Sequence, residues 1–146
     1  MLHLVDGFSQ VLNPLFALAL LGAAFWTLKR EAPLWVFQVS LATLAVQQIV
    51  KAMHKHHVLG DHFPSTHFAF ALAMAAGFTA LNRRFVVPVA AYLAFYGVLM
   101  LVRGYHTPFE MLGALPALPL VFLVARLRLG RLGAQSGTKR ERVASE

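Results

Sequence analysis

Cysteine is absent from the 146-residue chain, and charged residues make up only 13% of it. The lack of cysteine excludes disulfide bonds, thiolate metal sites and a cysteine nucleophile. Soluble domains carry about 25% charged residues, so the shortage of charge argues against a water-soluble fold. Acidic residues are the scarcest charged type, with six Asp and Glu against thirteen Lys and Arg. Few carboxylates are therefore left to serve as metal ligands.

Apolar residues are abundant instead, at 58% of the chain with a mean hydropathy of +0.63. They form five segments, at 11–28, 33–53, 65–81, 85–102 and 108–127. A membrane-spanning helix needs about 20 apolar residues, and lipid leaves helices as the simplest way to satisfy the backbone of such runs. The pattern predicts an all-α integral membrane bundle of about five transmembrane helices, in one domain at 1–129.

Three features refine the ends and bends of these helices. Residues 1–6 lack the basic start of a signal peptide, so the first segment is expected to be retained. Asn13-Pro14 marks either the start of the first helix or a kink in it. Pro116 and Pro119 are expected to bend the fifth helix.

The net charge of +7 is distributed in the way that membrane topology dictates. Most of the basic residues lie in two short loops and the tail: Lys29, Arg30, Arg83, Arg84, Arg126, Arg128, Arg131, Lys139, Arg140 and Arg142. Five spans place these regions on one side, and the positive-inside rule makes that side cytoplasmic. The distribution does not favour nucleic acid as a partner. The tail, 130–146, is expected to be a disordered, basic, cytoplasmic segment beside anionic lipid.

The remaining basic residues, Lys51, Lys55 and Arg103, fall on the opposite, extracytoplasmic side. They lie in two polar stretches between apolar segments. We call residues 51–67 the first island and residues 103–110 the second island. We expect the two islands to meet at one membrane face and to form a single site that handles phosphate.

The first island ends in Pro64-Ser65-Thr66-His67, where a polar loop becomes an apolar helix. Ser65 is a good N-cap, which places Thr66 and His67 in the first helical turn. The unpaired N–H groups of that turn form an anion site, where His67 can donate a proton to a departing oxygen. Lys51 and Lys55, one helical turn apart, can add positive charge. Lys51 and Arg103 also suit an alternative role as snorkelling anchors at helix ends.

The second island places His106 four residues before Glu110, close enough for the carboxylate to accept a hydrogen bond from Nδ1–H. That bond leaves Nε2 free as a nucleophile or base. Arg103 is positioned to clamp phosphoryl oxygens. Thr107-Pro108-Phe109-Glu110 is also a capping box, so helix capping is an alternative or additional role of Glu110. Two histidines, one acid and several cations suit phosphoryl transfer through a phosphohistidine, without metal or other cofactor.

These residues resemble the type 2 phosphatidic acid phosphatase superfamily, whose three signatures are K-x6-R-P, P-S-G-H and S-R-x5-H-x3-D. Pro64-Ser65-Thr66-His67 is similar to the second signature, His106-x3-Glu110 to the end of the third, and Lys51 to the start of the first. The resemblance covers residues 51–113. It implies that His106 is the nucleophile, Glu110 its partner and His67 the general acid. It also implies that Lys51, Ser65 and Arg103 bind phosphate.

The chain departs from the family pattern at several positions. Thr66 replaces Gly, Glu110 replaces Asp, and Val58 stands where the first signature has Arg. Lys55, His56 and His57 are the candidates to supply that missing cation. The Arg of the third signature lies six residues before the nucleophile, where this chain has Met100; Arg103 lies only three before. The family also has six spans as a rule.

The sequence therefore predicts a metal-independent membrane phosphatase in an inner or plasma membrane of bacterial type, with a lipid substrate. The candidate substrates are an isoprenoid diphosphate, phosphatidic acid and phosphatidylglycerol phosphate. One alternative is a membrane metalloenzyme that uses a histidine cluster, drawn from His54, His56, His57, His62, His67 and His106. The other is a catalytically degenerate protein that binds anionic lipid or assists assembly.

Overall fold

The computed structural model describes residues 2–56 and 63–144, and the side chains of 11–53, 55–56 and 63–130. Every regular element in this part of the chain is helical, which confirms the all-α class. The elements are α1 (Leu2–Leu28), η1 (Lys29–Glu31), α2 (Ala32–Lys55), α3 (Thr66–Leu81), η2 (Arg83–Phe85), α4 (Val86–Val102), α5 (Pro108–Leu112) and α6 (Ala117–Ala144).

Among the described residues, three helical stretches are long and apolar enough to cross a membrane: Val11–Met53, Arg83–Val102 and Pro108–Gly130. The first of them includes most of α1 and most of α2, and α3 is shorter, with 16 residues. Large apolar side chains cover the outside of the bundle, among them Trp26 and Val87, which are 87% and 77% exposed. A surface this rich in exposed hydrocarbon is typical of a protein embedded in lipid.

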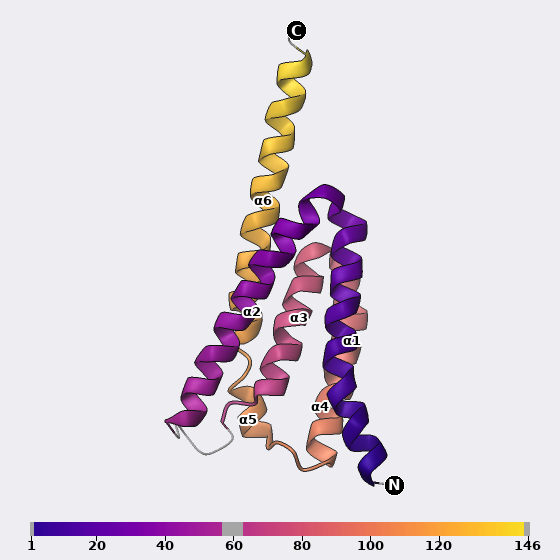
Figure 1. The fold of residues 1–146 in the computed structure, drawn as a ribbon, viewed down its shortest axis with the longest axis vertical. Coiled ribbons are helices and arrows are strands. Elements are labelled where there is room, and N and C mark those ends of the chain that lie inside the picture. Colours follow the sequence, from indigo (N-terminus) through magenta and orange to yellow (C-terminus); the bar gives the residue numbers. More distant parts are fainter. Residues whose placement is uncertain (1, 57–62, 145–146) are drawn as a thin grey trace.

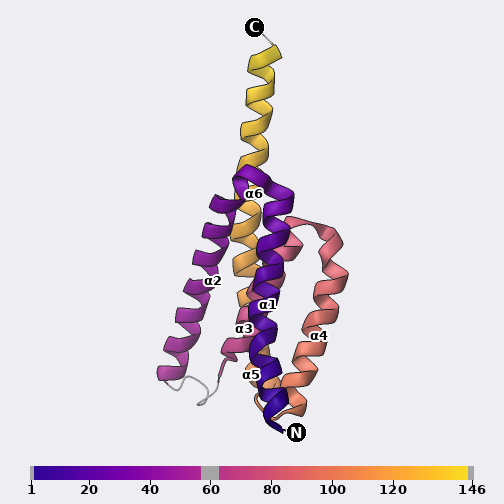
Figure 2. The ribbon, with the colours of Figure 1, turned by 45° about the vertical axis from the view of Figure 1, so that its right-hand side comes forward.

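The helices run up and down between two ends of an elongated bundle (Figure 1). The α1–α2 hairpin, the α3–α4 connection and the C-terminus lie at one end, and a view turned by 45° shows the same arrangement (Figure 2). The C-terminal end of α2, the N-terminal end of α3 and the link from α4 to α5 lie at the other end. The basic loops and the islands thus separate to opposite ends, as the five-segment pattern predicts.

Helix α3 is the centre of the bundle and packs against α1, α2, α4 and α6. Most of its residues are buried, and alanines are frequent among them. A helix that is apolar on every face is buried on every face. Its small side chains let the neighbouring helices approach closely; at Gly77, an added Cβ would come within 2.8 Å of Leu20 Cδ2. Because α3 is held on all sides, its N-terminus is fixed at the end of the bundle that carries the islands.

Three details differ from the sequence-based expectation. Helix α1 begins at Leu2 and passes through Pro14, so Asn13-Pro14 does not start the helix. The fifth segment is divided into α5 and α6 by a turn at 113–116, rather than bent. Proline has no N–H to donate, and Pro116 and Pro119 therefore stand just before and within the first turn of a new helix. Helix α6 continues to Ala144, through the tail expected to be disordered.

The segment before α3 packs against α5 and the turn after it. The rings of Phe63 and Phe109 stack with their centroids 4.9 Å apart. Gly113 lies directly under the Phe63 ring: a Cβ added there would overlap the ring and come within 3.0 Å of Pro64 Cβ. Glycine at this position lets the two islands pack together.

We expect Gly113→Ala to lower the free energy of unfolding by about 1–3 kcal/mol, because overpacking displaces the Phe63 ring. Gly22→Ala is the matched control, since nothing lies within 4 Å of a Cβ added to this helical glycine. We expect the control to be neutral or to stabilise the protein by up to about 1 kcal/mol. Unfolding in detergent, followed by circular dichroism, measures both variants. Equal stability of the two variants would show that the islands are not packed as described.

Candidate functional site

His106 and Glu110 are positioned by the end of α4 and the start of α5. Gly104, with φ of +66°, adopts the left-handed conformation that favours glycine, and Tyr105 N–H donates back to Met100 C=O at 3.1 Å. This bond closes the C-terminus of α4. The chain then turns into α5, for which Thr107 is the N-cap. His106 is therefore held between two fixed helix ends.

The carboxylate of Glu110 makes both of the contacts that the sequence suggested. Its Oε2 lies 3.1 Å from His106 Nδ1 and accepts a hydrogen bond from Thr107 N–H at 3.0 Å. Thr107 Oγ1 accepts in turn from Glu110 N–H at 3.3 Å, which completes the capping box. The predicted His106–Glu110 contact and the predicted box are both confirmed. The side chains are largely buried, with 11% of His106 and 17% of Glu110 exposed.

The first island contributes the N-terminus of α3. Ser65 is the N-cap, as predicted, and its Oγ accepts from Phe68 N–H at 3.2 Å. Ser65 is fully buried, so its hydroxyl serves the helix rather than the surface. Thr66 and His67 follow in the first turn, and His67 is exposed.

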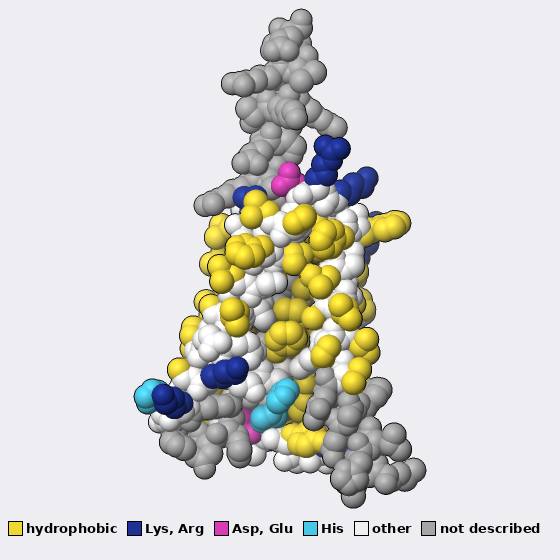
Figure 3. All heavy atoms as spheres, viewed as in Figure 1, with side chains coloured by type: hydrophobic (Ala, Val, Ile, Leu, Met, Phe, Trp, Pro, Cys, Tyr) yellow, Lys and Arg dark blue, Asp and Glu magenta, His cyan; other side chains and the backbone are white. Residues whose placement is uncertain are grey.

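The two islands meet at this end of the bundle, as predicted. Ser65 N–H donates to the C=O of Glu110 at 3.0 Å, which joins the backbone of one island to that of the other. The imidazole rings of His67 and His106 lie with their centroids 6.3 Å apart, tilted by 45°. In Figure 3, histidine, lysine and acidic side chains gather at the same end of the visible face.

A pocket of about 620 Å³ opens beside His67. Its lining residues come from α1, α2 and α3: Asn13, Pro14, Gln47, Lys51, Thr66, His67 and Phe70. Three predicted site residues, Lys51, Thr66 and His67, thus line one pocket. His106 is not among the lining residues, but its ring centroid lies 6.3 Å from that of His67. Among the described residues, no acidic side chain lines this pocket.

Asn13 is part of the site although the sequence analysis did not assign it there. It is buried in α1, where its Nδ2 donates to His67 C=O at 3.3 Å and to Tyr96 Oη at 3.0 Å. Tyr92 O–H donates to Asn13 Oδ1 at 3.3 Å. The amide therefore ties the first turn of α3 to α1 and α4. The sequence signal for this role was the position of Asn13, a polar residue within the long apolar segment 11–28.

Gln47 makes an interhelical hydrogen bond to the same turn. Its Nε2 donates to Thr66 C=O at 3.1 Å, so α2 also holds the first turn of α3. Gln47 lines the pocket as well. Asn13 and Gln47 together leave His67 little freedom of position.

The other predicted cations do not line the pocket. Lys55 and His56 are exposed at the end of α2. Arg103 is half-buried at the C-cap of α4. His57, Val58 and His62 lie outside the described residues, as does the side chain of His54. Which of Lys55, His56 and His57 supplies the missing cation therefore stays open.

The electrostatics of the site centre on His67, which lies outside the three candidate spans. Partial desolvation of its ring lowers the pKa of His67 below the ordinary 6.5, and the nearby His106 lowers it further. Both effects penalise the charged imidazolium. A bound anion would raise the pKa of His67 instead, because it favours the charged imidazolium. The first turn of α3 and Lys51 add positive potential at the same place.

Within the described residues, no group of three or more His, Asp or Glu side chains could hold a metal ion. His67 and His106 are near each other, and Glu110 contacts only the second of them. The histidine cluster of the metalloenzyme alternative would depend on positions 54, 57 and 62, whose side chains are not described.

Comparisons of the chain with protein-family models, curated proteins and solved structures find no match. The function must therefore be inferred from the site itself.

Proposed function

We propose that the protein is a metal-independent phosphatase that hydrolyses a membrane lipid phosphate or diphosphate through a phosphohistidine on His106. The observation that carries the proposal is the His106–Glu110 contact at 3.1 Å beside His67, at the edge of a pocket lined by Lys51. The resemblance to the type 2 phosphatidic acid phosphatases supports the same assignment of roles.

The first half of the reaction forms the phosphoenzyme. Nδ1–H of His106 donates to Glu110, which selects the tautomer with a lone pair on Nε2. Nε2 attacks phosphorus, a P–N bond forms, and the bond from phosphorus to the leaving oxygen breaks. His67 donates a proton to that oxygen. Glu110 stabilises the positive charge that develops on the His106 ring.

The second half restores the enzyme. His67, now neutral, takes a proton from a water molecule as its oxygen attacks phosphorus. The P–N bond breaks, inorganic phosphate leaves, and both histidines return to their starting forms. Lys51 and the N-terminus of α3 stabilise the phosphoryl charge throughout. We assign Ser65 to holding that helix end, because its buried hydroxyl already accepts from Phe68.

We also infer that the chain crosses the membrane five times, with α5 and α6 counted as one crossing. Helix α3, with 16 residues, is about 24 Å long, close to the roughly 30 Å of a bilayer core. The basic loops then lie in the cytoplasm and the islands face the extracytoplasmic side. A site at the membrane surface suits a headgroup presented by a lipid.

The first prediction from this mechanism concerns His106. With EDTA present, the detergent-solubilised wild type should release phosphate from a panel of lipid phosphates. We expect His106→Ala to lower kcat by about three orders of magnitude or more, because the nucleophile is lost. Gln48→Ala is the control, an exposed polar residue of α2 that does not line the pocket, and should leave kcat unchanged.

Two other outcomes would contradict the proposal. Turnover that EDTA abolishes and zinc restores would support the metalloenzyme. Lipid binding without phosphate release, equal in wild type and His106→Ala, would support a binding or assembly protein.

The second prediction separates the two roles of Glu110. Gln at this position can still complete a capping box, so Glu110→Gln should retain its thermal stability. It should lose about 10²–10⁴ in kcat, because a neutral amide stabilises neither the correct tautomer nor the imidazolium. Thr107→Ala should show the reverse, losing about 0.5–2 kcal/mol of stability with little change in kcat. If Glu110→Gln kept full activity, capping would be the sole role of Glu110.

The third prediction concerns His67 as the acid. We expect His67→Ala to lose about 10²–10⁴ in kcat/KM on an alkyl phosphate and much less on an aryl phosphate, whose leaving group needs no proton. The parameter kcat/KM reports formation of the phosphoenzyme, the step in which His67 is the acid. Because the pKa of His67 lies below 6.5, its protonated form is lost as the pH rises through that region. In the wild type, kcat/KM for the alkyl substrate should fall there. A fall of the same shape in His67→Ala would assign it to the ionisation of the substrate instead.

A further inference from the structure

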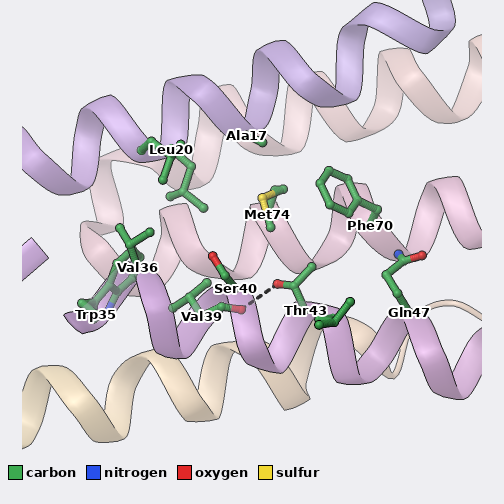
Figure 4. A pocket seen from close by; sticks show the side chains of 12 residues that line it. Ala17, Leu20, Trp35, Val36, Val39, Ser40, Thr43, Gln47, Phe70 and Met74 are labelled. Carbon is green, nitrogen blue, oxygen red and sulfur yellow. Dashed lines mark hydrogen bonds between the residues drawn. The ribbon is translucent and has the colours of Figure 1, made fainter. Parts of the chain in front are cut away.

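A second pocket, of about 280 Å³, lies between α1 and α2 with α3 as its floor (Figure 4). It is lined by Ala17, Leu20, Leu21, Trp35, Val36, Val39, Ser40, Thr43, Leu44, Gln47, Phe70 and Met74. The lining is almost entirely apolar. Thr43, one of three polar residues in the lining with Ser40 and Gln47, donates its hydroxyl to Val39 C=O at 2.8 Å. We call this pocket the apolar groove.

We call the pocket beside His67 the phosphate pocket. It lies end to end with the apolar groove, because Gln47 and Phe70 line both. The phosphate pocket presents Lys51 and His67, and the apolar groove presents hydrocarbon side chains. Figure 3 shows the same change along one face, with hydrophobic side chains in its middle and basic and histidine side chains toward one end. The combined surface is suited to an amphipathic molecule with an anionic head.

The length of the groove fits one hydrocarbon chain. Its wall on α2 extends from Trp35 to Gln47, twelve residues apart, which is about 18 Å at 1.5 Å per residue. One leaflet of a bilayer core is about 15 Å deep, half of roughly 30 Å. Ser40 and Leu44 on this wall are exposed, so a chain can enter sideways between α1 and α2.

We propose that the apolar groove binds one hydrocarbon chain of the lipid whose phosphate occupies the pocket at Lys51 and His67. The inference rests on the proposed function for the phosphate end and adds the site for the chain. Gln47 marks the boundary: its amide is held by Thr66 C=O, where the headgroup ends and the chain begins. The groove makes the protein selective for chain length. Binding should tighten as the chain lengthens until the groove is full, through close packing of the chain against the groove, because a chain that leaves lipid or detergent gains no hydrophobic transfer energy.

The experiment uses Trp35, which lies buried at the inner end of the groove, where its Nε1–H donates to Ala125 C=O at 3.3 Å. Trp26→Phe removes the other tryptophan, which is 87% exposed. The full-length variant in detergent is titrated with a non-hydrolysable single-chain lipid phosphonate that carries bromine near the end of its chain. Bromine quenches indole fluorescence at short range, so a seated chain should quench Trp35 saturably. The unbrominated phosphonate should compete.

A pair of substitutions tests the location. Ser40→Phe places a large side chain in the groove from an exposed position, without repacking the core. It should raise the apparent Kd at least about tenfold, because the added ring fills space that the chain would occupy. Ala45→Phe makes a comparable enlargement on α2, at an exposed site that lines neither of these two pockets, and should leave the Kd unchanged.

The outcomes test chain binding in the groove separately from phosphatase activity. Saturable quenching that Ser40→Phe weakens supports the groove, even if no lipid phosphate is hydrolysed. Phosphate release from lipids without quenching of Trp35 would overturn the groove and leave the phosphatase standing. Equal quenching by a brominated uncharged alcohol, with no competition by the phosphonate, would show only detergent-like partitioning and would also overturn it. If Ser40→Phe does not fold, the competition between brominated and unbrominated phosphonate decides alone.

Discussion

The hydrogen bond from Ser65 N–H to Glu110 C=O is the contact on which the candidate site depends. It joins the N-cap of α3 to α5, and the two bonded residues lie 45 positions apart in the chain, with α3 and α4 between them. Glu110 is bound at both ends, since its carboxylate also contacts His106 and Thr107. A single hydrogen bond contributes about 1 kcal/mol, but linked bonds in a site partly shielded from water couple the positions of all their members. The separation of the two imidazole rings follows from this linkage.

The rest of the bundle keeps α3 in place for that contact. Within a bilayer there is no hydrophobic driving force between helices, so close packing and buried hydrogen bonds must hold them together. The alanines of α3 provide the close packing. Asn13, Gln47 and Trp35 provide the hydrogen bonds, from α1 to α3 and α4, from α2 to α3, and from α2 to α6. Two of these three side chains bond directly to the first turn of α3. The stability of the fold and the geometry of the site thus depend on the same contacts.

The sequence allowed the local features to be predicted and left the distant ones undetermined. Ser65 as an N-cap, the Thr107–Glu110 capping box and the His106–Glu110 contact all depend on residues within a few positions of each other. The contacts of Asn13 join residues 54 and 83 positions apart, and nothing in a single sequence pairs such residues. The division of the fifth segment into α5 and α6 could be anticipated only as a bend, because prolines both kink and start helices. The sequence could not show whether Lys55 and Arg103 reach the pocket. Each lies at the end of a helix, and the direction in which the chain continues determines where its side chain lies.

The departures from the phosphatase signatures have physical explanations in the geometry of the site. A carboxylate at the third residue of a helix completes a capping box best when it is Glu, because the longer side chain reaches back to the N-cap N–H. In this chain the same Oε2 serves Thr107 and His106, so Glu110 caps the helix while it orients the histidine. Thr66 in place of Gly is compatible with the first helical turn, where no special backbone conformation is needed. Its C=O accepts from Gln47, which lines both the pocket beside His67 and the apolar groove. Where the chain differs from the signatures that it resembles, it still has a carboxylate beside His106 and a helix N-terminus at His67.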